Sequence, residues 1–274
     1  MKKIALILSA CMGGLISSAV QAYDYSNHIT PDGVEYGFHQ GDKNGPLLIA
    51  MTTDIKESLS DVYSPIGGLL AKKGYSIAAI DVTCHGKDLK KKEKYGLDCW
   101  RSRADKSESN IFESYTAHVK SVISDIAKTQ QTDTSNVTAL GVSRGGYLAM
   151  KTAAELPEIT IVIALAPVTD VFRLREFDDA SASRSLYSIK PFYPVLSKKH
   201  LFLQINNNDD RVGTDEAISL IRGVVAAGGQ REVDLTAVIT PRKGHSTSEH
   251  EAAAAWAVNA RKAGVEAVQM APPK

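Results

Sequence analysis

Several features that would assign a protein to a particular class are missing from this sequence. Cysteine occurs only three times in 274 residues, and basic and acidic residues nearly cancel, at 32 and 31. No basic stripe carries the interleaved aromatic residues typical of nucleic-acid binders, so we expect no nucleic-acid partner. No metal-ligand cluster is visible, and no Gly-Lys-Ser/Thr phosphate loop follows Gly146, so we expect no cofactor and no metal. Linkers, repeats and low-complexity tracts are also missing, and the length suits one domain.

The first 22 residues, MKKIALILSACMGGLISSAVQA, differ from the rest of the sequence in composition, because they are mostly apolar. Two lysines precede an apolar run that ends at Ala22, with Val20 at the minus-three position. This pattern predicts a secretory signal peptide over residues 1–22 and a periplasmic or secreted mature chain over 23–274. Glycine and serine interrupt the run, which falls short of the ~20 apolar residues of a membrane span. A second interpretation is a lipoprotein, because residues 8–11 resemble a lipid-attachment box ending at Cys11.

Export decides how the remaining cysteines are interpreted. If Cys11 leaves with the signal peptide, Cys84 and Cys99 reach an oxidising compartment as a pair. We therefore expect a disulfide between Cys84 and Cys99, which closes the loop that carries His85.

The mature sequence alternates short apolar runs with amphipathic stretches. Runs typical of buried strands cover 33–40, 46–52, 75–82, 136–142, 160–168, 200–207 and 233–240. Helical periods lie between them, over 60–73, 111–128, 144–155, 215–227 and 248–263. This alternation predicts an α/β fold, in which a mostly parallel sheet of about eight strands has helices on both faces.

The stretch GVSRGGY, residues 141–147, places Ser143 between two glycines. A lone G-x-S-x-G is weak, because glycine is common. Here it joins an expected strand to an expected helix, so Ser143 stands at the carboxyl edge of the sheet, where open α/β sheets carry their sites. A sharp turn at that point needs small neighbours, which Gly141 and Gly145 supply. We interpret Ser143 as a nucleophile.

With four further signals, this turn resembles the α/β-hydrolase superfamily over nearly all of the mature chain. The order Ser, Asp, His along the sequence is the order of that family. The resemblance is to serine hydrolases of the esterase, prolyl-oligopeptidase-like or dienelactone-hydrolase-like branch. The four signals are Gly74-Tyr75 before a strand ending in Asp81, His85-Gly86, the D-x-x-V of Asp209 to Val212, and Gly244-His245.

The resemblance implies a catalytic base and an acid that orients it. His245 is the candidate base, because it follows the last expected strand and precedes a helix. His250, in the first turn of that helix, is its rival. Asp209 matches the family spacing for the acid, while Asp210 and Asp170 are the alternatives.

Hydrolysis also requires N–H donors for the oxyanion of the tetrahedral intermediate. The resemblance implies that the backbone of Arg144, directly after the nucleophile, supplies one donor. The second comes from the loop after 46–52, where Thr52 and Thr53 replace the usual His-Gly pair. We expect the backbone N–H of Thr53 or Asp54 to serve there.

Two segments offer contacts to a substrate. Trp100 and Arg101 could line a pocket at the sheet edge or hold an acidic group, or Trp100 could simply anchor its loop. The segment at about 169–198 is an insertion long enough for a small lid only, with Phe172 among the aromatic residues on its underside. So small a cover predicts a fairly open site.

The sequence is thus interpreted as an exported serine hydrolase. It would cleave small or short-chain carboxylic esters through an acyl-enzyme, and its partner would be a small-molecule ester. One alternative is an amidase or exopeptidase of the prolyl-oligopeptidase type, with Arg101 or Asp54 anchoring a peptide terminus. Another is a hydrolase-fold binding protein without activity, since fold analogy does not name a substrate.

Overall fold

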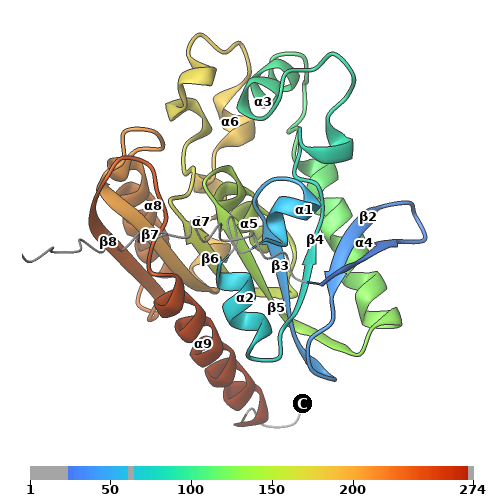
Figure 1. The fold of residues 1–274 in the computed structure, drawn as a ribbon. Coiled ribbons are helices and arrows are strands. Elements are labelled where there is room, and N and C mark those ends of the chain that lie inside the picture. The colour runs from blue at the N-terminus through green and yellow to red at the C-terminus, as the bar shows by residue number, and fades with distance from the viewer. Residues whose placement is uncertain (1–23, 61–64, 271–274) are drawn as a thin grey trace, which may run out of the picture.

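A single sheet of eight strands forms the centre of the protein (Figure 1). The computed structural model describes residues 24–60 and 65–270, with the backbone alone over 264–270. The strand order is β1-β2-β4-β3-β5-β6-β7-β8. The strands are β1 (Ser26–Ile29), β2 (Glu35–His39), β3 (Gly45–Met51), β4 (Ser76–Ala79), β5 (Thr132–Val142), β6 (Ile159–Leu165), β7 (His200–Asn208) and β8 (Leu235–Lys243).

The sheet is parallel except at one edge. β2 pairs antiparallel with β1 and with β4, and every other pairing is parallel. The carboxyl ends of β3 to β8 therefore meet at a common edge, which confirms the predicted α/β architecture. The expected signal peptide and Cys11 lie outside the described residues.

Helices cover both faces of the sheet. α4 (Glu113–Thr129), α5 (Arg144–Glu155) and α8 (Thr214–Gly228) pack on one face, and α2 (Pro65–Ala71) and α9 (His250–Met270) pack on the other (Figure 1). Alternate residues of β3 point to opposite cores, so Ile49 contributes to the first and Leu48 to the second. Because both faces are buried, such strands have unbroken apolar sequences. In the described part of the chain, no helix is both long and apolar enough to span a bilayer.

The elements that were not expected from the sequence include β1 and α3. β1 is a four-residue edge strand with mostly exposed side chains, so it lacks an apolar signature. α3 (Leu97–Ala104) is short and polar, and it buries only Cys99, Trp100 and Ala104. By contrast, α5 begins and ends at the residues expected from its periodicity.

Between β6 and β7, in the segment where the sequence predicts an insertion, the chain forms short helical turns. Two of its aromatic side chains, Phe177 and Tyr187, are buried in the main core. The insertion is thus packed down onto the domain. Its elements are η2 (Val171–Arg173), η3 (Arg175–Phe177), α6 (Arg184–Tyr187), η4 (Lys190–Phe192) and α7 (Tyr193–Leu196).

The Cys84 and Cys99 sulfurs are bonded to each other, across a sequence separation of 15 residues. The bond connects the loop after β4 to α3. Both cysteines are fully buried, and the loop between them contains His85 and Gly86.

Candidate active site

Ser143 occupies a strained turn between β5 and α5. Its backbone has φ 54° and ψ −116°. Residues other than glycine rarely adopt this region, which costs on the order of 1–3 kcal/mol. Neighbouring backbone groups hold it there. The Ser143 N–H donates to the Leu165 carbonyl (2.9 Å), and its carbonyl accepts from Val168 (2.9 Å) and Gly146 (3.0 Å). The turn presents the side chain at the end of the strand, as a nucleophile requires.

The glycines around Ser143 are required by close backbone contacts. A Cβ on Gly141 would lie 2.0 Å from the Gly145 carbonyl oxygen, and one on Gly145 would lie 1.6 Å from the Met51 carbonyl oxygen. No side chain fits at either distance. The second contact also shows that the end of β3, and thus the loop that begins at Thr52, lies against the turn.

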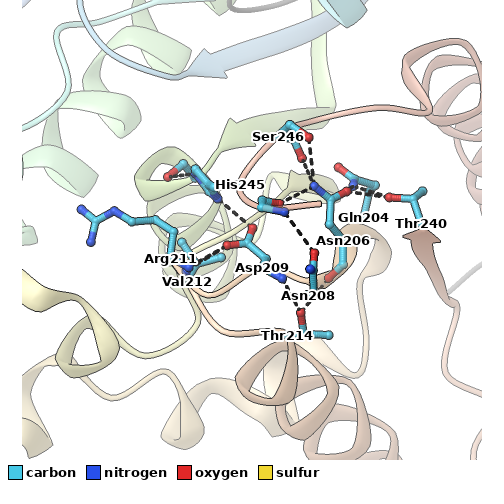
Figure 2. A network of polar contacts seen from close by, with 12 residues as sticks. Gln204, Asn206, Asn208, Asp209, Arg211, Val212, Thr214, Thr240, His245 and Ser246 are labelled. Atoms are coloured by element: carbon cyan, nitrogen blue, oxygen red, sulfur yellow. Dashed lines mark hydrogen bonds and ion pairs between the residues drawn. The ribbon is translucent and has the colours of Figure 1, made fainter. Parts of the chain in front are cut away.

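His245 bridges Ser143 and Asp209. Its Nε2 lies 3.0 Å from Ser143 Oγ, and its Nδ1 lies 2.8 Å from Asp209 Oδ2. These residues follow β8, β5 and β7, whose carboxyl ends share one edge of the sheet. Figure 2 shows the contact between His245 and Asp209 from close by. The structure thus brings together the three side chains that the sequence singled out.

The Asp209 carboxylate is held in place from behind. Its Oδ1 accepts N–H bonds from Arg211 (3.0 Å) and Val212 (3.2 Å), and the side chain is completely buried. The valine of the D-x-x-V signal therefore closes the turn through its backbone. With Oδ1 occupied, Oδ2 is directed toward His245.

The rival residues lie elsewhere. Asp210 is exposed. Asp170 accepts an N–H bond from Phe172 (2.9 Å) at the start of η2. His250 contacts the Thr247 hydroxyl at 3.1 Å. None of these contacts involves Ser143 or His245.

The expected oxyanion donors differ in their surroundings. Arg144 is the first residue of α5, and N–H groups at a helix start have no partner within the helix. The N–H groups of Thr52 and Thr53 both point at the buried Ser58 hydroxyl, at 3.3 and 3.2 Å. The Thr53 donor is thus occupied in this structure, and its role as an oxyanion donor stays a prediction.

Asp54 stands at the start of a short helix. Its Oδ1 caps α1 (Ile55–Ser58) by accepting the Glu57 N–H at 2.8 Å. The carboxylate is therefore committed to a helix start, which is an unfavourable arrangement for the suggested anchoring of a peptide terminus.

His85 is fully buried near Arg144. Its Nδ1 lies 3.1 Å from the Thr83 carbonyl oxygen. Burial, followed by the positive charge of Arg144, lowers the pKa of His85 to about 4. Its imidazole is therefore neutral at neutral pH. Among the described residues, its Nε2 has no hydrogen-bond partner.

The predicted substrate contacts of Trp100 and Arg101 are wrong. Trp100 is fully buried, and its indole N–H donates to the Thr83 carbonyl at 2.8 Å, so it anchors its loop. Arg101 pairs with Asp105 and donates to the carbonyls of Asp178 (2.5 Å) and Asp179 (2.8 Å). Its guanidinium therefore fastens the insertion to α3, and is not free for an acidic group.

Phe172 belongs to the aromatic cluster of the insertion. Its ring centroid lies 5.5 Å from that of Phe177, and the Arg184 guanidinium lies 4.6 Å above the ring. The side chain is partly buried against the core. A substrate contact of Phe172 stays a prediction.

Fold and site together define an α/β hydrolase in which a histidine contacts both a serine and an aspartate. The sequence matches the prolyl oligopeptidase family over residues 68–261, and the chain belongs to that family of serine hydrolases. No curated protein sequence matches the chain.

Solved structures with the same fold include peptidases and esterases. Dipeptidyl peptidase 4 of Porphyromonas gingivalis has a TM-score of 0.63 at 14% identity, over 89% of this chain and 35% of its own. An esterase of Pyrococcus furiosus has a TM-score of 0.60 at 16% identity, over 86% of this chain and 91% of its own. TT1662 of Thermus thermophilus has a TM-score of 0.65 at 15% identity, over 86% and 98%. The present chain thus spans about a third of the dipeptidyl peptidase.

Proposed function

We propose that this protein hydrolyses carboxylic esters of small or short-chain acyl groups, with Ser143 as nucleophile, His245 as base and Asp209 as the orienting acid. The observation that carries the proposal is the unbroken path from Ser143 Oγ through both nitrogens of His245 to the buried Asp209 carboxylate, with steps of 3.0 and 2.8 Å. A serine hydroxyl alone is a poor nucleophile, and this path supplies its activation.

In the first half of the reaction, Ser143 Oγ attacks the ester carbonyl carbon while His245 Nε2 takes the hydroxyl proton. The tetrahedral intermediate collapses, the bond to the alkoxide breaks, and the imidazolium returns the proton to the leaving alcohol. Water then attacks the acyl-enzyme in the same way, and the acid is released. Asp209 Oδ2 accepts the Nδ1–H throughout, which keeps Nε2 available as the base and stabilises the imidazolium.

The oxyanion requires donors on the side of Ser143 that faces the end of β3. The Arg144 N–H is one, since it starts α5 directly after the nucleophile. The amide of Thr53 or of Asp54 is the other. The Thr53 N–H lies at a long 3.2 Å from the Ser58 hydroxyl, a bond that a charged oxyanion can replace. A donor of this kind typically contributes about 3 kcal/mol to transition-state stabilisation.

Ester and peptide substrates are the two candidate classes. The ester proposal is supported by the small insertion and by the near end-to-end correspondence with the esterase of Pyrococcus furiosus, which the chain covers over 91%. Membership of the prolyl oligopeptidase family favours peptides as the second candidate. The proposal places the enzyme outside the cytoplasm, since the first 22 residues have the pattern of a signal peptide and two cysteines are paired.

Labelling with a fluorophosphonate tests the proposal directly. We expect one adduct, located on Ser143 by peptide mass spectrometry, and none in the Ser143→Ala variant. Ester turnover in that variant should fall on the order of 10⁶-fold, as for other hydrolases of this type. Full ester turnover in the Ser143→Ala variant would contradict the proposal.

A pair of chromogenic substrates then separates the two classes. We expect nitrophenyl acetate to be cleaved with a higher kcat/KM than dipeptidyl nitroanilides that carry proline beside the scissile bond. The opposite order would make the protein a peptidase.

A further inference from the structure

Two buried amide side chains in β7 are not used by the mechanism described above. Gln204 and Asn206 are both completely buried, and the other buried residues of the strand are apolar. Burial of an amide is unfavourable unless all of its polar atoms find partners. The partners therefore indicate what these side chains are for.

The side-chain carbonyl oxygen of Asn206, Oδ1, is hydrogen-bonded to side chains of β7 and β8. Oδ1 accepts hydrogen bonds from Gln204 Nε2 (3.0 Å) and from the Thr240 hydroxyl (2.6 Å). With both lone pairs occupied, Nδ2 must point the other way, toward the loop that follows β8. Figure 2 shows the Asn206 side chain between these two groups of partners.

The two N–H bonds of Asn206 act on the peptide groups on either side of His245. Nδ2 lies 2.7 Å from the carbonyl oxygen of Gly244 and 3.1 Å from that of Ser246, with the Ser246 hydroxyl at 2.9 Å. A carbonyl oxygen can only accept, so a donor is required at this position. One buried amide thus fixes the backbone both before and after the base.

The same residue also reaches the acid. The backbone carbonyl of Asn206 accepts a bond from the Thr214 hydroxyl (2.6 Å), and that hydroxyl accepts the Asp209 N–H (3.0 Å). Asn206, at the end of β7, is therefore linked by hydrogen bonds both to the loop with His245 and to the turn with Asp209.

We propose that Asn206 is a positioning residue for His245. The inference rests on the proposed function, since it assigns His245 as the base. Without the two N–H donors, the loop of Gly244 to Ser246 loses its hydrogen bonds to the buried Asn206 side chain, and His245 Nε2 moves relative to Ser143 Oγ. Because a displacement of about 1 Å can cost roughly 10²-fold in rate, the loss should appear in kcat and leave KM unchanged.

The test compares Asn206→Asp, which keeps the shape and removes the donors, with Leu203→Ala as a matched control. Leu203 lies in the same strand, and it is buried without any hydrogen bond from its side chain to the loop. The measurements are the fluorophosphonate labelling rate, kcat and KM for a nitrophenyl ester, and the melting temperature. Asn206→Ala, which adds no buried charge, serves if Asn206→Asp does not fold.

We expect the Asn206 variant to lose roughly 10²-fold in labelling rate and in kcat with KM unchanged. Leu203→Ala should melt at a lower temperature and label at the wild-type rate. A folded Asn206 variant that labels at the wild-type rate would overturn the inference, as would an equal loss in Leu203→Ala. Failure of the wild-type protein to label would instead overturn the proposed function, and this inference with it.

Discussion

His245 and Asp209 are joined by a 2.8 Å hydrogen bond between Nδ1 and Oδ2, although 36 residues separate them in the chain. The carboxylate is completely buried, whereas the imidazole is 28% exposed. The acid is thus screened from water while the base faces the open edge of the sheet. This division allows His245 to meet a substrate, and it makes the Asp209 charge act mainly on one nitrogen.

The choice of acid can be tested with two amide variants. Asp209→Asn should reduce kcat by about 10⁴-fold, because an amide can donate to Nδ1 and so favour the wrong tautomer of His245. The exposed neighbour provides the control, and Asp210→Asn should retain nearly full activity. Kinetics on a nitrophenyl ester measure both. A larger loss at Asp210 would move the acid by one residue.

The choice of base has a similar control. His245→Ala should lower kcat by several orders of magnitude, close to the effect of Ser143→Ala, because the two act as one unit. His250→Ala should change kcat little, since the His250 Nε2 contacts the Thr247 hydroxyl, whereas His245 contacts Ser143 and Asp209. Labelling rates with a fluorophosphonate measure this without knowledge of the substrate. The reverse ranking would show that the assigned base is wrong.

The cysteine pair should contribute to stability. Closing a loop of about 15 residues is worth roughly 3 kcal/mol by chain entropy, so the Cys84→Ser/Cys99→Ser double variant should unfold that much more easily. Urea unfolding measures the difference. Peptide mapping of the protein under non-reducing conditions should recover the linked pair, and two free thiols would contradict the expectation.

Buried His85 should make the protein less stable in acid. Its pKa is lowered from 6.5 to about 4, chiefly by burial, so below pH 6.5 the unfolded chain binds a proton that the folded protein resists. The stabilisation is fully present above pH 6.5 and is lost as the pH falls toward 4, by about 3 kcal/mol in total.

Urea unfolding at several pH values between 4 and 7 tests this effect of His85. The His85→Gln variant should show a shallower decrease in unfolding free energy over that range, whatever its stability at pH 7. Identical slopes for the two proteins would exclude His85 as the cause.

The insertion should limit the length of the acyl group. Phe177 and Tyr187 are buried in the core, and Arg101 holds the segment against α3. We therefore expect no apolar tunnel from these side chains. A long acyl chain would then lie in water and lose the ~0.8 kcal/mol that each buried CH₂ contributes. We expect kcat/KM for nitrophenyl esters to peak between acetyl and butyryl and to fall by octanoyl. An optimum at dodecanoyl would instead indicate a lipid substrate.

Much of the site could be predicted because it is encoded locally. A buried strand, a serine between glycines and an amphipathic helix follow one another within 136–155, and backbone sterics alone make that order a sharp turn. The alternation of strands and helices then implies parallel pairing, which places residues after different strands at a common edge. Asp209 and His245 could be chosen by their position after β7 and β8, before any distance was known.

Other assignments depended on contacts between segments that are distant in the chain. Trp100 and Arg101 are residue types that often line pockets. The first, however, is buried and donates to the Thr83 carbonyl, and the second binds carbonyls more than 70 residues away in the chain. No local pattern shows that the Thr53 N–H meets Ser58.

The sequence by itself determined the α/β architecture, the turn at Ser143 and the order of the three site residues, because periodicity and backbone sterics act over a few residues. Only the tertiary structure decided which polar groups are left for chemistry and which are used within the protein. Asn206 is the clearest case. In the sequence it is one of three consecutive asparagines, and only the folding of β8 beside β7 brings its amide to the carbonyls on either side of His245. Hydrogen bonds of this kind are specified by distance and direction in space, which a linear pattern does not contain.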